Sequence, residues 1–155
     1  FAELDQTTVA MDVRLNVTFD PRLSLQVYAQ PFLSSADFGP PAELAAPGTY
    51  DFRVYGEDVG ETTRTETGWA VDPDGAGPAA AFNLPEQDFN LRSLRGNAVL
   101  RWEWRPGSTL YLVWQQDRRH IAPFGDFDFG RDRAALFRAE PDNVLVLKVN
   151  YWLNP

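Results

Sequence analysis

Hydrophobic and polar residues alternate along several stretches of the chain, most clearly around residues 94–116. From Leu94 to Trp104 the even-numbered positions are apolar or glycine, and the positions between them are mostly polar. Pro106 and Gly107 interrupt this pattern, as a tight turn requires, and the alternation then resumes. Because a period of two residues indicates a strand with unlike faces, this stretch predicts a long β-hairpin.

A second hairpin is predicted near the start of the chain. Residues 8–19 alternate strictly, with apolar side chains at the odd positions, and residues 23–29 do the same after a turn at Pro21. We expect Pro31 to end the second strand, because proline cannot donate to a ladder of hydrogen bonds. The first strand is longer than the ~5–6 residues usual in globular proteins and matches the ~9–11 residues of a strand that crosses a bilayer.

The remaining pattern consists of one more strand and two long loops. Residues 144–153 alternate again and predict the last strand. Residues 34–88 hold most of the Gly and Pro and contain one strand-like piece at 49–55, and residues 117–142 form a second loop with a helical turn near 134–138. Short turns at one end and long loops at the other are typical of outer-membrane barrels.

The predicted fold class is therefore all-β: an antiparallel, long-stranded sheet of about five strands, in a single β domain over residues 1–155. A bacterial barrel needs at least ~8 strands to close, so we expect the chain to be a fragment, the C-terminal sector of a transmembrane β-barrel. The alternative is a soluble β-sandwich or lipocalin-like ligand-binding module, in which the apolar stripe is an interior core. A β-rich glycan hydrolase is a third hypothesis, supported only by scattered carboxylates.

Composition narrows the function classes. The net charge of −8 argues against nucleic acid as a partner. The sequence has no Cys, which excludes disulfides, thiol catalysis and Cys-based zinc sites. The mean hydropathy of −0.35 is compatible with a membrane barrel, because lipid-facing and lumen-facing residues alternate.

Two sets of residues follow from the barrel interpretation. Charged residues on the polar sides of the strands would face the lumen, either as a structural ladder of ion pairs or as groups that tune a pore: Asp12, Arg14, Arg95, Arg101, Glu103 and Lys148. Aromatic residues near the strand ends would lie at the membrane interface: Phe19, Trp102, Trp104 and Tyr151.

Catalytic and metal sites have little support in the sequence. His120 is the single histidine and has no accompanying nucleophile motif, so we expect an exposed loop residue and no enzyme activity. Asp126, Asp128 and Asp132 are weak candidates for Ca²⁺ ligands, since carboxylate oxygens suit that ion but the EF-hand pattern is missing. No cofactor is expected.

Several segments resemble a known bacterial family: RLSLQVYAQPF, TYDFRVYG, DFNLRSLRGNAVLRWEWRPGSTLYLVWQQ and NVLVLKVNYWL. They are similar to the C-terminal outer-membrane β-barrel domain of unknown function 5916, which commonly follows a family 9 type carbohydrate-binding domain. The resemblance implies localisation in the bacterial outer membrane, contact with its lipid, and surface binding or uptake of glycans through the upstream domain. It supplies no catalytic residues.

Overall fold

The computed structural model describes residues 1–153, and most of them lie in β-strands. In chain order the elements are β1 (Ala2–Ala10), β2 (Val13–Asp20), β3 (Leu23–Leu44), β4 (Phe52–Val54), β5 (Glu61–Thr65), β6 (Gly68–Asp72), β7 (Phe82–Pro85), β8 (Phe89–Arg105), β9 (Ser108–Ala122), α1 (Phe129–Arg138) and β10 (Pro141–Asn150). The expected all-β class and large antiparallel sheet are confirmed.

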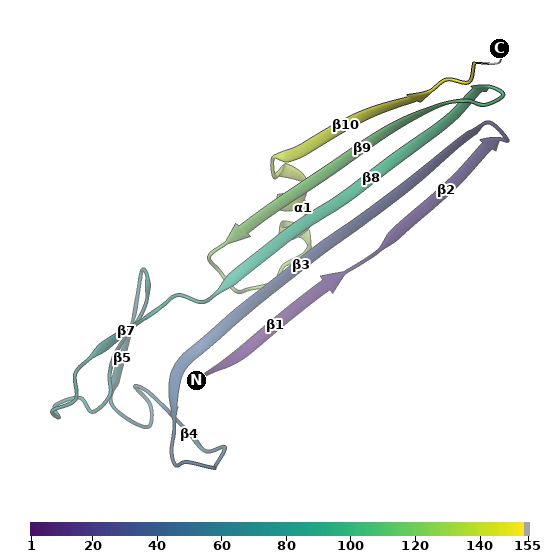
Figure 1. Cartoon of the computed structure of the whole chain (residues 1–155). Coiled ribbons are helices and arrows are strands. Elements are labelled where there is room, and N and C mark those ends of the chain that lie inside the picture. The colour runs from purple at the N-terminus through teal and green to yellow at the C-terminus, as the bar shows by residue number, and fades with distance from the viewer. Residues whose placement is uncertain (154–155) are drawn as a thin grey trace. The chain divides into compact units, whose positions relative to one another are not determined.

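The main sheet follows the order β1-β3-β8-β9-β10, and β2 and β4 pair with β3. Figure 1 shows these long strands side by side, with α1 behind the sheet. A second sheet has the order β5-β6-β7. Within the described residues the main sheet is open, because its edges are formed by β1 and β2 on one side and by β10 on the other.

Internal contacts divide the chain into two compact units. The strand unit contains Thr8–Ser34, Leu91–Ile121 and the chain from Asp128 onward. The hairpin unit contains Phe1–Thr7, Ser35–Asn90 and Ala122–Phe127. Each unit is described separately below.

The first two predicted strands need corrections. The strand expected at 8–19 is two strands, β1 and β2, separated at Met11 and Asp12. Pro31 does not end the next strand, since β3 continues to Leu44. A proline removes only a donor, and the Pro31 carbonyl still accepts from the backbone N–H of Met11 at 3.2 Å, where the neighbouring strand is interrupted.

The two long loops are also shorter than expected. Residues 34–88 contain the rest of β3 and the strands β4 to β7, because Gly and Pro there mark turns between short strands. Residues 117–122 belong to β9, and the predicted helical turn is the end of the full helix α1. The last strand begins and ends three residues earlier than predicted, at Pro141–Asn150.

The helix α1 begins at a clear N-terminal cap. Asp128 has an extended backbone, and its Oδ1 accepts from the backbone N–H of Arg131 at 2.6 Å. This bond satisfies one of the N–H groups that the first turn of a helix leaves free. Arg118 of β9 donates to the Phe137 carbonyl at 2.6 Å, so the last turn of α1 is fixed to the sheet.

Candidate functional site

One face of the strand unit is apolar, as the register of its strand pairs shows. Residues directly opposite each other in an antiparallel pair lie on the same face. Between β2 and β3 the apolar pairs are Val13–Ala29, Leu15–Val27 and Val17–Leu25. Between β9 and β10 they are Leu110–Val149, Leu112–Leu147 and Trp114–Leu145.

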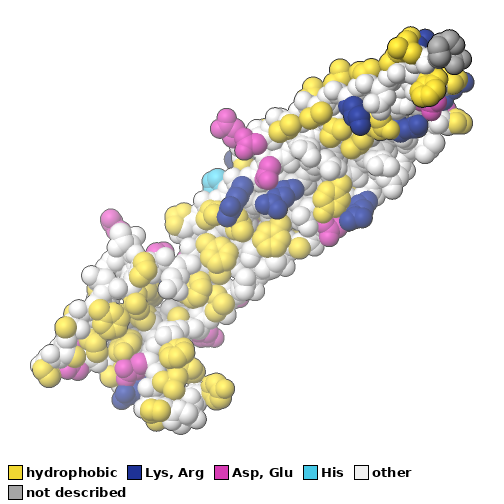
Figure 2. Space-filling view, in the orientation of Figure 1, with side chains coloured by type: hydrophobic (Ala, Val, Ile, Leu, Met, Phe, Trp, Pro, Cys, Tyr) yellow, Lys and Arg dark blue, Asp and Glu magenta, His cyan; other side chains and the backbone are white. Residues whose placement is uncertain are grey.

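This apolar face is open to solvent over much of its length. Leu15 is 52% exposed and Leu147 is 62% exposed, although both lie in the middle of their strands. Figure 2 looks onto the side of the sheet that faces away from α1, where hydrophobic side chains lie among charged ones. An exposed apolar area of this kind marks a surface that contacts another phase or molecule.

The opposite face carries the predicted charged residues in paired arrangements. Tyr28 donates to Asp12 at 2.7 Å, and the guanidinium of Arg14, the neighbour of Tyr28 across the strands, lies 5.4 Å from the centre of its ring. Asn16 and Gln26 form the adjacent cross-strand pair. Arg14, Tyr28, Asn16 and Gln26 line a shallow depression of about 450 Å³, together with Asn97 of β8.

The other predicted charged residues also have partners on the strands. Arg101 and Glu103 form an ion pair at 3.2 Å, and Arg95 pairs with Asp117 at 3.3 Å. The Lys148 amine lies 5.9 Å from the ring centre of Tyr111, its cross-strand neighbour. The lumen-facing role of this set stays a prediction.

The predicted aromatic residues lie near the β2–β3 and β8–β9 turns and the end of β10. Phe19 is 59% exposed, and the rings of Trp102 and Trp104 lie 6.5 Å apart at an angle of 61°. Arg105 stacks on Tyr151, with its guanidinium carbon 4.1 Å from the ring centre. Their contact with a membrane interface stays a prediction.

Sequence reasoning missed the buried ion pair that joins α1 to β8. Arg92 donates to Asp132 at 2.8 Å, with only 3% and 0% of the two side chains exposed. The carboxylate of Asp132 also accepts from Arg131 at 3.0 Å and from the backbone N–H of Asp128 at 3.1 Å. The one signal in the sequence is that Arg92 lies in register with the alternating apolar residues from Leu94 to Trp104.

Each of the three acidic candidates for Ca²⁺ contacts another part of the protein. Asp132 binds arginine, Asp128 caps the helix, and the backbone carbonyl of Asp126 accepts from the Asn90 amide at 3.0 Å. Among residues 1–153 no three His, Cys, Asp or Glu side chains gather as metal ligands. His120 lies on strand β9, not in a loop, and its Nδ1 is 3.1 Å from Nη1 of the buried Arg92.

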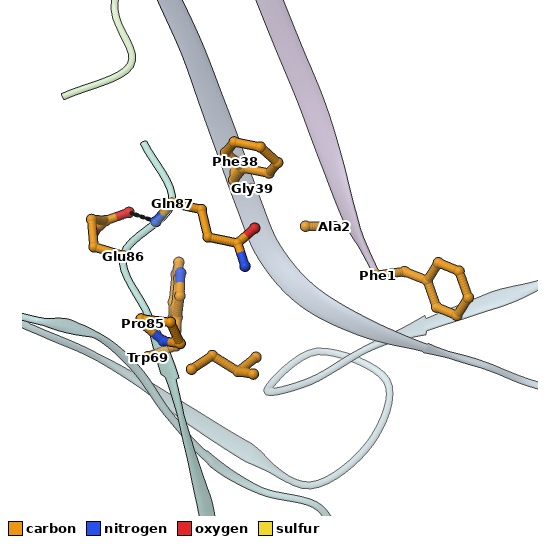
Figure 3. A pocket seen from close by; sticks show the side chains of 9 residues that line it. Phe1, Ala2, Phe38, Gly39, Trp69, Pro85, Glu86 and Gln87 are labelled. Carbon is orange, nitrogen blue, oxygen red and sulfur yellow. Dashed lines mark hydrogen bonds between the residues drawn. The ribbon is translucent and has the colours of Figure 1, made fainter. Parts of the chain in front are cut away.

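The hairpin unit contains a small cleft that sequence reasoning missed, with a volume of about 210 Å³. Figure 3 shows the rings of Phe38 and Trp69 and the side chain of Gln87 around it. Gly68 makes the close approach of β6 and β7 possible, because its φ is +139° and a Cβ there would lie 2.0 Å from the Leu84 carbonyl oxygen. Trp69 is thereby held opposite Leu84.

Tyr55, in the hairpin unit, has a pKa that its surroundings shift from the ordinary value. Its ring is buried, and its hydroxyl donates to Glu43 at 2.8 Å. Burial is the main cause that raises the pKa of Tyr55 above its ordinary value, and the bond to Glu43 raises it further.

None of the helices within residues 1–153 is long and apolar enough to cross a membrane. No curated protein matches the chain, and no solved structure matches it either. One family model matches residues 1–154, which is nearly the whole chain. The chain therefore belongs to the family described as Domain of unknown function (DUF5916).

Proposed function

We propose that the chain is the C-terminal sector of an outer-membrane β-barrel of the bacterial envelope, a non-enzymatic protein whose apolar face contacts lipid. The observation that carries this proposal is the exposed apolar face of the strand unit, backed by a polar face with paired charges. Side chains that alternate between lipid and an aqueous interior give strands this two-faced pattern.

The strand lengths support the same function. A tilted strand needs ~9–11 residues to cross the hydrocarbon core, and β8, β9 and β10 have 17, 15 and 10 residues. The aromatic residues near the turns suit the interface between lipid and water, where amphipathic rings are enriched.

The open edges of the sheet also support a sector of a larger structure. Within the described chain, β10 pairs only with β9, and β1 and β2 pair only with β3. An unpaired edge exposes N–H and C=O groups that cannot remain unsatisfied in lipid. In this proposal further strands of the full protein pair with these edges and close the barrel.

The test uses nitroxide labels on single-cysteine variants of the full-length protein in lipid vesicles. Because the chain has no Cys, Leu15→Cys and Asn16→Cys each place one label, on neighbouring residues of opposite faces. We expect the label at position 15 to be accessible to oxygen and shielded from a polar quencher.

The label at position 16 serves as the matched control and is expected to show greater access for the polar quencher. Equal polar access at the two positions would reject the lipid-facing assignment. A monomeric, cooperatively folded protein in detergent-free buffer would instead favour the soluble ligand-binding module, with the apolar face as its core.

A further inference from the structure

The cleft of the hairpin unit has the chemistry of a binding site for a small neutral ring. Its walls are mainly apolar and come from Phe38, Trp69, Leu84 and Pro85, and the side-chain amide of Gln87 points into it in Figure 3. Small-molecule sites typically combine apolar walls with a few polar groups that fix orientation. The volume of about 210 Å³ is below the roughly 300–1,000 Å³ of drug-sized sites, so the cleft has room for a single ring.

A hydrogen-bonded network holds the two aromatic walls in place. The guanidinium carbon of Arg64 lies 4.7 Å from the ring centre of Trp69, its cross-strand neighbour. The same guanidinium binds Glu86 and, at 3.0 Å, Asp88, and Asp88 accepts from the backbone N–H of Phe38 at 2.8 Å. Asp88 therefore connects Phe38 to the group that covers one side of Trp69, and the cleft is formed before any ligand arrives.

The charges around the cleft disfavour an anionic ligand. Arg64 is compensated by two carboxylates, Glu86 and Asp88, so no free cation faces an incoming anion among these residues. The Glu86 carboxylate also accepts from the backbone N–H groups of Gln87 and Asp88. The amide of Gln87 makes no hydrogen bond with the described residues, and it offers one acceptor and two donors to a ligand.

We propose that this cleft binds one pyranose ring of a neutral saccharide. A pyranose presents an apolar C–H face that packs on an aromatic ring, and hydroxyl groups at its edge that both donate and accept. Trp69 and Phe38 supply the aromatic surfaces, and the Gln87 amide matches a pair of hydroxyl groups. This binding site goes beyond the proposed barrel function and does not depend on it.

Saturation-transfer NMR on the full-length protein tests the proposal, with methyl glucoside, methyl galactoside and methyl mannoside as separate probes. We expect at least one of them to bind with millimolar affinity, with transfer strongest at the C–H groups of one ring face. Gln87→Ala is expected to weaken that affinity about fivefold to tenfold, since it removes one or two hydrogen bonds. Gln115→Ala, an exposed glutamine of β9 outside the cleft, is expected to leave the affinity unchanged.

Trp69→Ala is expected to abolish transfer. If the loss of Trp69 disturbs the fold, Gln87→Ala still tests the proposal, because Gln87 is exposed and its removal leaves the packing intact. No transfer from any of the three glycosides, or equal affinity in the wild type and Gln87→Ala, would overturn the proposal. Transfer to N-acetylproline amide with none to the glycosides would assign the cleft to a peptide side chain and would overturn it as well.

Discussion

Asp132 is an acidic residue whose charged side chain is fully buried. Its carboxylate is fully buried and accepts from Arg92, Arg131 and the backbone of Asp128. Removing one partner of a buried ion pair leaves the other charge without compensation, which typically costs ~3–5 kcal/mol. Loss of either partner is therefore expected to weaken the attachment of α1 to the sheet, which Arg118 also supports.

We expect Asp132→Ala to lower the free energy of unfolding by about 3–5 kcal/mol, as measured by urea titration of the protein refolded in lipid vesicles. Asp142→Ala is the control, because Asp142 is exposed on β10. The double change Arg92→Leu with Asp132→Leu should recover much of the loss, since apolar side chains can replace a buried pair. A loss in the double variant as large as that of Asp132→Ala would show that the charges themselves are required.

Tyr55 gives a prediction about alkaline pH. Its pKa in the folded protein is raised, mainly by burial, so the folded state holds the phenol proton more tightly than the unfolded state does. The stabilisation is fully present below the ordinary tyrosine pKa of ~10 and is lost as pH rises through the higher folded value.

Absorbance titration of the phenolates, with Tyr55→Phe as the reference for assignment, should show that Tyr55 ionises above the ordinary range. Glu43→Gln is expected to bring that ionisation to lower pH, because it removes the negative charge beside the hydroxyl. An unchanged titration in Glu43→Gln would mean that burial alone sets the pKa.

At the scale of elements, the β8–β9 hairpin depends on one glycine. Gly107 has a φ of +76°, and a Cβ there would lie 3.0 Å from the Cβ of Trp152. The left-handed conformation costs other residues roughly 1–2 kcal/mol. We expect Gly107→Val to destabilise the fold by at least this amount in urea titrations, whereas Gly75→Val should cost only the conformational part, because nothing lies within 4 Å of Gly75. Equal effects at the two positions would exclude a contribution from Trp152.

The two faces of β2 allow a second test at this scale. Leu15→Asp places a charge on the apolar face, and Asn16→Asp places the same charge beside Arg14 on the polar face. We expect only the first change to reduce the folded fraction in outer membranes. The charge on the lipid-facing side should cost a folding free energy on the order of 2 kcal/mol. The measurement is the heat-modifiable shift of the folded band in gel electrophoresis, and equal folded yields would contradict the prediction.

Local alternation predicted which residues of a long strand share a face, because side chains alternate with a period of two, but it misplaced several strand ends. The opposed pairs Leu15–Val27 and Leu112–Leu147 join residues that the sequence placed on the apolar sides of their strands. Alternation could not predict that β3 passes through Pro31. The proline is tolerated because the neighbouring strand is interrupted at Met11, whose backbone N–H donates to the Pro31 carbonyl, and the sequence around Pro31 does not contain this information. It also missed β5 to β7, whose short strands lie between turn residues.

The buried ion pair and the cleft were less predictable than the apolar face, because both are made by contacts between segments that are distant in the sequence. Arg92 and Asp132 are 40 residues apart, and neither the strand pattern nor the helix pattern requires them to meet. The cleft similarly combines Phe38 of β3 with Trp69 of β6 and the segment after β7. Each of these residues has an ordinary local role, so only the folded structure brings them together.

At the scale of the whole molecule, the exposed apolar face and open edges predict poor behaviour in water. We expect the 155-residue chain to aggregate when it is diluted from denaturant into detergent-free buffer, since unpaired edge strands and apolar patches both promote association. Analytical ultracentrifugation with and without detergent measures this difference. A monodisperse monomer in buffer alone would argue against lipid as the partner of the apolar face.

Lys148 has a practical consequence for surface chemistry. Lys148 is the single lysine of the sequence and therefore its single side-chain amine. Its nitrogen lies on the face that carries Tyr111, opposite the Leu112–Leu147 stripe. An amine-reactive reagent that cannot enter lipid therefore modifies one side chain within these 155 residues. The extent of reaction at Lys148 in intact cells, measured on the peptide that contains it, reports how much water reaches that face.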